Sequence, residues 1–178
     1  MIVIMRPRLF ILAAGLVLAG CSSESTPTSG GSTATTPPAA SATTGAAGDG
    51  LPDPCTLLTK SEVDAATGGT FGQGAINTTV SQEFISACDW QSSGVATVQV
   101  LVTTVDAFET SRQAAAQTYG SADDVTVPKA KRAYVAKGGF LIGMDMGEIY
   151  LQVSYIATGA NVAAVVRDLA AKTAGRTG

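Results

Sequence analysis

The sequence contains no histidine. That absence excludes a Ser-His-Asp triad, a Cys-His catalytic pair and a zinc site with histidine ligands. Basic residues are also few, with 11 Lys and Arg against 14 Asp and Glu and a formal net charge of −3 at pH 7. A nucleic-acid partner is therefore not expected, because proteins that neutralise phosphates carry a basic surplus.

The apolar run at residues 9–18 is too short to span a membrane. As a helix it would rise about 15 Å, half of the roughly 30 Å hydrocarbon core of a bilayer. Arg6 and Arg8 precede it, as in the positively charged start of an export signal. The run therefore predicts a leader peptide, which begins at either Met1 or Met5.

Directly after this run, Leu18-Ala19-Gly20-Cys21 resembles the lipobox of bacterial lipoproteins. The resemblance implies that residues 1–20 are cleaved and that the Cys21 thiol carries a diacylglyceryl anchor. Two acyl chains hold a protein stably on a bilayer, which places the chain on the outer face of the cytoplasmic membrane. Arg6 and Arg8 are not adjacent, which favours the general secretory route. The alternative is an ordinary secretory leader that leaves Cys21 as a free thiol.

Residues 22–50 contain no Val, Ile, Leu, Met or aromatic residue. Such a segment cannot bury enough apolar surface to offset its ordering entropy. Together with Cys21 it predicts a disordered tether over residues 21–50, ahead of a globular domain at residues 51–178. The many Ser, Thr and Pro residues are typical of an O-glycosylated stalk, and a bare spacer is the alternative.

Two cysteines remain in the domain, Cys55 and Cys88. Disulfides persist in exported proteins, so we expect these two to be bonded; the alternative is two separate buried thiols. Trp90 follows two residues after Cys88. It either packs against the disulfide in the core or lines a ligand groove.

The domain alternates helical and strand patterns. A capping box at Thr59 and Glu62 starts the first helix and Gly68 stops it. Asp106 caps a second helix, which runs to Tyr119. Alternating apolar residues predict strands, and a third helix ends the chain. The expected strands are 84–90, 95–104, 133–137, 140–146 and 149–156, and the last helix is 161–174.

These elements predict an α+β fold in the order α-β-β-α-β-β-β-α, with a mainly antiparallel sheet of five to six strands and three helices packed on it. Gly147-Glu148 provides a two-residue hairpin turn between the last two strands. Apolar and polar residues alternate in the last strand, which predicts a sheet with one face packed on the core and the other exposed to solvent. Residues 121–129 are expected as a loop, with a possible short strand at Val125 and Val127, and residues 70–82 as a loop with a possible edge strand.

The motif Asp53-Pro54-Cys55-Thr56-Leu57-Leu58-Thr59, followed by Glu62-Val63, Gly68 and Cys88-x-Trp90, resembles actinobacterial envelope lipoproteins of a large domain family of unknown function. Mycobacterial, nocardial and streptomycete lipoproteins are typical members. The resemblance implies a lipid-anchored, disulfide-bonded α+β domain without catalytic residues. The family usually has Gly-x-Gly before the Ala-Tyr step, where this chain has residues 129–132 instead.

Other candidate sites have two interpretations each. Asp123-Asp124 is either part of a calcium site or a solvated loop. Gly72-x-Gly74 lacks the third glycine of a dinucleotide-binding loop. Met144 and Met146 either face the core or form an adaptable binding surface. The sequence has one basic cluster, which consists of Lys129, Lys131, Arg132 and Lys137. This cluster either binds anionic lipid headgroups or an acidic partner, or it is a solvated loop.

The sequence therefore predicts a non-catalytic binding or accessory module of the cell envelope, with no cofactor and no metal. Its partners would be the membrane, through the anchor on Cys21, and an envelope protein, a lipid or the cell wall. The alternatives are a small envelope hydrolase or transferase that uses carboxylates, and a purely structural envelope component.

Overall fold

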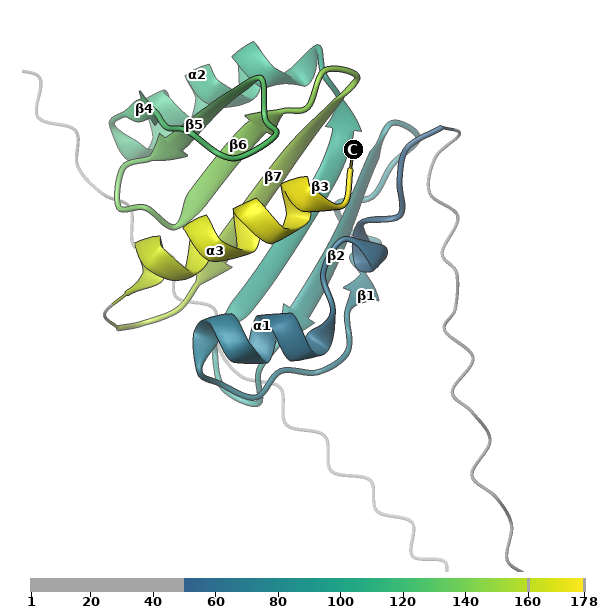
Figure 1. The fold of residues 1–178 in the computed structure, drawn as a ribbon, viewed down its shortest axis with the longest axis vertical. Helices are drawn as coiled ribbons and strands as arrows, with labels where there is room; N and C mark the ends of the chain where they lie inside the picture. The colour runs from purple at the N-terminus through teal and green to yellow at the C-terminus, as the bar shows by residue number, and fades with distance from the viewer. Residues whose placement is uncertain (1–49, 160, 178) are drawn as a thin grey trace, which may run out of the picture. The chain divides into compact units, whose positions relative to one another are not determined.

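A computed structural model describes residues 50–159 and 161–177. The predicted signal peptide, Cys21 and the tether up to residue 49 lie outside the described residues. The described part forms one antiparallel sheet of seven strands with the spatial order β1-β2-β3-β7-β6-β5-β4 (Figure 1). None of its helices has the length and apolar character needed to cross a bilayer.

Three α-helices and one short 3-10 helix accompany the sheet within the described residues. The α+β class is thereby confirmed. The elements in chain order are η1 (Pro54–Thr56), α1 (Lys60–Thr67), β1 (Ala75–Ile76), β2 (Ile85–Gln91), β3 (Thr97–Thr104), α2 (Ala107–Tyr119), β4 (Ala122–Asp124), β5 (Arg132–Ala136), β6 (Leu141–Asp145), β7 (Ile149–Ile156) and α3 (Val162–Gly175).

The prediction of five to six strands was too low, because the sheet has a short strand at each edge. β1 lies within residues 70–82 and confirms the possible edge strand expected there. β1 pairs with β2, and β4 pairs with β5. Strands of two and three residues are too short to show alternation in the sequence. The predicted strand at Val125 and Val127 was wrong, since the pairing segment lies just before it. The observed order is α-β-β-β-α-β-β-β-β-α.

One face of the sheet holds the main core. α1 and α3 pack there, with α3 over β6 and β7 and α1 against α3 (Figure 1). Successive side chains of a strand point to opposite faces, so every second residue of β2, β3, β6 and β7 is buried under these helices. The fully buried side chains include Leu58, Val63, Trp90, Val98, Val100, Val102, Ile142, Met144, Leu151, Val153, Val166 and Leu169.

The opposite face is also covered, but only over one half of the sheet. α2 packs on β4, β5 and β6, where Phe108 and Tyr134 belong to a second buried cluster. The prediction that only one face of the sheet is buried was therefore wrong for β7, because Tyr150 and Ser154 are buried on the α2 side. No helix of the described residues packs on the remaining half of this face, over β1 and β2 (Figure 1).

Local signals set most helix ends as predicted. The Thr59 hydroxyl accepts from the Glu62 backbone N–H, the Glu62 carboxylate accepts from the Thr59 N–H, and Gly68 ends α1 in the left-handed conformation. The predicted cap at Asp106 was wrong, because its backbone is helical and its side chain makes no capping bond. Gly147 has φ +105° between β6 and β7, in line with the predicted tight turn.

Arg176 ties the end of α3 to the start of the domain. Its Nη1 donates to the Leu57 carbonyl at 2.8 Å, and its Nη2 donates to Glu62 Oε1 at 2.8 Å. Burial raises the pKa of the Glu62 carboxyl, but the hydrogen bonds from Thr59 and Arg176 outweigh burial, so the pKa lies below its usual value. The charged form of Glu62 thus stabilises the folded state.

We expect Arg176→Ala to lower the free energy of unfolding by about 1–2 kcal/mol at neutral pH, because the Leu57 carbonyl loses this donor and Glu62 loses its ion pair and keeps only its bonds from Thr59. A carboxyl with a lowered folded pKa stabilises above its unfolded pKa, and this contribution disappears as the pH falls through the folded pKa. The Glu62 share of the deficit should therefore vanish in acid. Urea unfolding at neutral and acid pH measures both effects.

Arg167→Ala is the matched control, because Arg167 is exposed on the same helix and forms no ion pair within the described residues. Equal stability losses for the two arginine variants would contradict the role assigned to Arg176.

Candidate functional site

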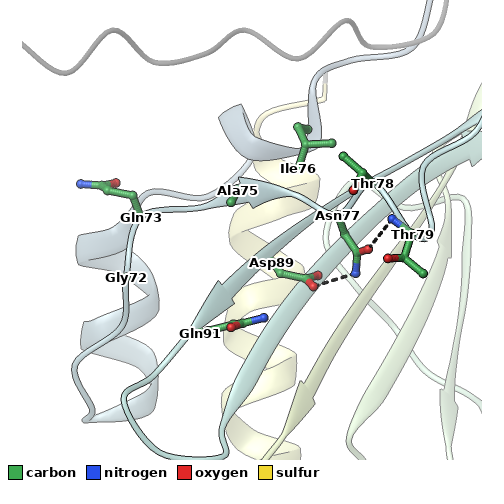
Figure 2. A pocket seen from close by; sticks show the side chains of 9 residues that line it. All are labelled: Gly72, Gln73, Ala75, Ile76, Asn77, Thr78, Thr79, Asp89 and Gln91. Carbon is green, nitrogen blue, oxygen red and sulfur yellow. Dashed lines mark hydrogen bonds between the residues drawn. The ribbon is translucent and has the colours of Figure 1, made fainter. Parts of the chain in front are cut away.

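A hollow of about 450 Å³ lies at the edge of the sheet (Figure 2). The chain segment between α1 and β2 forms one wall, and β2 forms the other. Ligand sites in proteins have volumes of about 300–1,000 Å³. Its lining is polar, and a single residue of it, Asp89, carries a charge. The lining consists of Gly72, Gln73, Ala75, Ile76, Asn77, Thr78, Thr79, Asp89 and Gln91.

The loop that forms one wall is held closely against the sheet. The Gly72 N–H donates to the Gln91 carbonyl at 2.8 Å, and the Asn77 N–H donates to the Ala87 carbonyl at 2.8 Å. Between these bonds, Gly74 lies directly on the core: a Cβ at this position would come within 2.7 Å of the Trp90 ring and 2.8 Å of the Cys88 sulfur. The hollow therefore has a wall that rests on the disulfide.

Asp89 is the chemical centre of the hollow. Its Oδ2 accepts from Asn77 Nδ2 at 2.8 Å and its Oδ1 accepts from Gln99 Nε2 at 2.8 Å. Asn77 is itself oriented, because its Oδ1 accepts from the backbone N–H of Thr79 at 3.1 Å. Figure 2 shows Asp89 and Asn77 pointing toward each other, whereas Gln73 points away. Two amides thus hold the half-buried carboxylate in place.

A second, smaller cavity of about 260 Å³ lies beside α2, where Arg112 and Arg132 meet Phe108. Its charges are already paired. Arg112 lies 2.9 Å from the carboxylate of Asp124. Arg132 stacks over the Phe108 ring at 4.4 Å and also pairs with two acids, Asp145 at 2.9 Å and Glu109 at 2.5 Å. These ion pairs fasten α2 to β4, β5 and β6.

Two buried tyrosines lie beneath α2. The hydroxyls of Tyr134 and Tyr150 are hydrogen-bonded at 2.8 Å, and Tyr150 also donates to Gln152 Oε1 at 3.1 Å. Burial raises the pKa of both hydroxyls, and for Tyr150 the neighbouring Tyr134 raises it further. Both therefore stay protonated at neutral pH and act as a structural hydrogen-bonded pair.

The predicted disulfide between Cys55 and Cys88 is confirmed, with a Cα–Cα distance of 5.2 Å. Cys88 is fully buried and Trp90 belongs to the same core cluster. Trp90 thus packs in the core, the first of its two interpretations. Cys21, the predicted lipidation site, lies outside the described residues.

The remaining candidates serve the fold. Met144 is fully buried and Met146 packs against the main core. Asp123 and Asp124 lie in β4 rather than in a loop, and no group of three or more potential ligands gathers in the described part of the chain. In Gly72-x-Gly74, the close approach to Trp90 requires glycine at position 74.

The four residues of the predicted basic cluster contact different parts of the fold. Lys129 Nζ donates to the Gly175 carbonyl at 2.9 Å, at the end of α3. Arg132 is held by its acidic partners below α2. Lys137 lies close to Gly120, at the end of α2, and Lys131 close to Gly147. At least two of its four members thus have structural partners.

The sequence reasoning did not single out Asp89 and Asn77. Asp89 lies between Cys88 and Trp90, and strand alternation places it on the face opposite to those two core residues. That signal was present in the sequence. The position of Asn77 depends on the pairing of the two-residue strand β1, which carries no such signal.

A family model of proteins of unknown function, DUF3558, matches residues 16–140. The chain belongs to this family. The DUF3558 match begins within the apolar run before Cys21 and includes the hollow and both bridged cysteines; it ends before β6, β7 and α3. The expected membership of a domain family of unknown function is thus confirmed. Neither the curated proteins nor the solved structures contain a match to this chain.

Proposed function

We propose that this DUF3558 chain is a membrane-anchored extracytoplasmic lipoprotein that acts as a non-catalytic binding module of the cell envelope, of the actinobacterial type that its motifs resemble. Its location depends on Leu18-Ala19-Gly20-Cys21, which stands directly after an apolar run of leader length. A Cys55–Cys88 disulfide supports an export route, because disulfides persist outside the cytosol.

The observation that carries the binding function is the polar hollow around Asp89. Its wall is anchored on the core through Gly74, and its carboxylate is oriented by Asn77 and Gln99. Such a site is formed before any ligand arrives, which reduces the entropy cost of binding. A glycoside hydrolase of the common type uses two carboxyl groups at one cavity, and the lining of the hollow contributes one.

We expect Cys21→Ala to release the protein from the membrane, because the diacylglyceryl chains have no other attachment point. After cell fractionation the wild type should sediment with membranes and the variant should be soluble. Intact-mass analysis of the wild type should show loss of residues 1–20 and the added acyl mass.

Cys55→Ala is the matched control, since it removes a different cysteine and should leave the protein in the membrane fraction. Retention of Cys21→Ala on membranes to the wild-type extent, or a wild-type mass without acyl groups, would contradict the proposed location.

A further inference from the structure

We propose that the hollow around Asp89 binds a neutral saccharide, whose hydroxyl groups donate hydrogen bonds to the Asp89 carboxylate; this rests on the proposed function and names its ligand class. The carboxylate faces a cavity of about 450 Å³ with no lysine or arginine of the described residues paired to it. That volume accommodates one or two sugar rings.

The carboxylate has acceptor capacity to spare. An ionised carboxyl group offers about four lone-pair sites, and Asp89 receives one hydrogen bond on each oxygen, from Asn77 and from Gln99. Both of these donors are neutral amides, so the negative charge remains uncompensated in the hollow. A ligand that brings hydroxyl donors would form charge-assisted hydrogen bonds there, which are about twice as strong as neutral ones.

The rest of the lining selects hydroxyl groups over other ligand chemistry. Gln91, Thr78 and Thr79 are exposed around Asp89, and their side chains have no hydrogen-bond partner within the described residues. Amides and hydroxyls both donate and accept. Sugar hydroxyls do the same and can match both capacities, whereas an ammonium group only donates and would match only the acceptors, leaving the Gln91 N–H groups to water.

Two other ligand classes fit the hollow poorly. A phosphate or carboxylate ligand would be repelled by Asp89 and would find no cationic side chain in the lining. An acyl chain needs apolar walls, and the lining offers only Ala75 and Ile76 as apolar side chains larger than glycine. The chemistry of the residues present therefore favours an uncharged polyhydroxyl ligand.

The test is an NMR titration of the full lipid-anchored chain, held in a detergent without a sugar headgroup. The probes are neutral tetrasaccharides of glucose, mannose, galactose and N-acetylglucosamine. We expect at least one to shift the amide signals of residues 72–79 and Gln91, with a Kd on the order of 0.1–1 mM. Asp89→Asn should weaken that binding by at least about tenfold, since it removes the charged acceptor.

Gln91→Ala should weaken binding about threefold through loss of one neutral hydrogen bond, and it keeps the test decisive if Asp89→Asn loosens the loop. Gln117→Ala, an exposed glutamine on α2, is the matched control and should bind as the wild type. The inference is overturned if no tetrasaccharide shifts these signals at about 10 mM, if both hollow variants bind unchanged, or if a lysine-rich tetrapeptide shifts them and the sugars do not.

The same spectra separate this inference from the proposed function. A chain that carries its lipid anchor but binds none of the sugars refutes only the ligand class. Appearance of new anomeric signals during the titration would show that a sugar is cleaved, and would refute the non-catalytic function while supporting the ligand class.

Discussion

Removal of both cysteines of the bridge, in the variant Cys55→Ala/Cys88→Ala, is expected to lower the free energy of unfolding by about 3–4 kcal/mol. The bridge spans 33 positions of the chain and ties the segment around η1 to β2. Without it the unfolded chain gains conformational freedom, and the buried Cys88 site loses a packed sulfur atom. Guanidinium unfolding in a Cys21→Ala background measures the difference.

The wild-type bridge can also be tested without a substitution. The Cys21→Ala protein treated with a thiol reductant should unfold at nearly the same denaturant concentration as the double variant. A loss below about 1 kcal/mol in both experiments would show that the bridge contributes little. When the bridge is removed, amide hydrogen exchange should increase most in the loop at Gly74, because this loop packs on the Cys88 sulfur.

Gly143→Ala is expected to destabilise the domain by about 2–3 kcal/mol, an effect typical of overpacking a core. A Cβ on Gly143 would come within 2.5 Å of Tyr134 Cζ and 2.7 Å of the Tyr150 hydroxyl. The two tyrosines cannot withdraw easily, because both pack edge-on against the Phe108 ring and are bonded to each other. Thermal unfolding of the purified variant measures the loss.

Gly175→Ala is the matched control, since a Cβ there meets no atom within 4 Å and the residue belongs to α3. It should be neutral or slightly stabilising, because alanine favours helix. In a Tyr134→Leu background the effect of Gly143→Ala should shrink, because the ring that it strikes is gone. An equal effect in both backgrounds would mean that the clash is not the cause.

Much of the fold could be predicted because its signals are local. The capping box at Thr59 and Glu62 acts over three residues, and the turn at Gly147 joins two strands that are neighbours in the chain. The pairing of β3 with β7 is different. These strands are separated by α2 and three other strands, and nothing in either strand alone specifies its partner.

The short edge strands and the cap at Asp106 show the limit of local reasoning. β1 exists because Ala75 and Ile76 pair with Asp89 and Cys88 of the longer strand β2. Asp106 had the residue type of a cap, but the chain leaves β3 in a helical conformation that turns its side chain away from this role. In both cases the conformation of a neighbouring segment outweighed the local preference.

Predicting the candidate site would have required both local sequence signals and contacts between distant segments. Alternation along β2 already places Asp89 opposite to Cys88 and Trp90, on the face that α2 leaves open beyond β4, β5 and β6. The donors that orient its carboxylate come from Asn77 and Gln99, twelve and ten residues away. Gln99 lies directly opposite Asp89 in the β2–β3 pair. Sequence spacing gives no sign of the approach of Asn77, because that depends on the loop at Gly74 packing closely on Trp90.

The sequence by itself determined the α+β class, the pairing of Cys55 with Cys88, and the ends of α1, since each follows from residue type or from contacts within a few positions. Only the tertiary structure decided that both faces of the sheet are covered in part, which residues form the two short edge strands, and that a lone carboxylate faces a polar hollow. These features arise from contacts between distant segments, whose free energy depends on the whole packed domain rather than on any one stretch of chain.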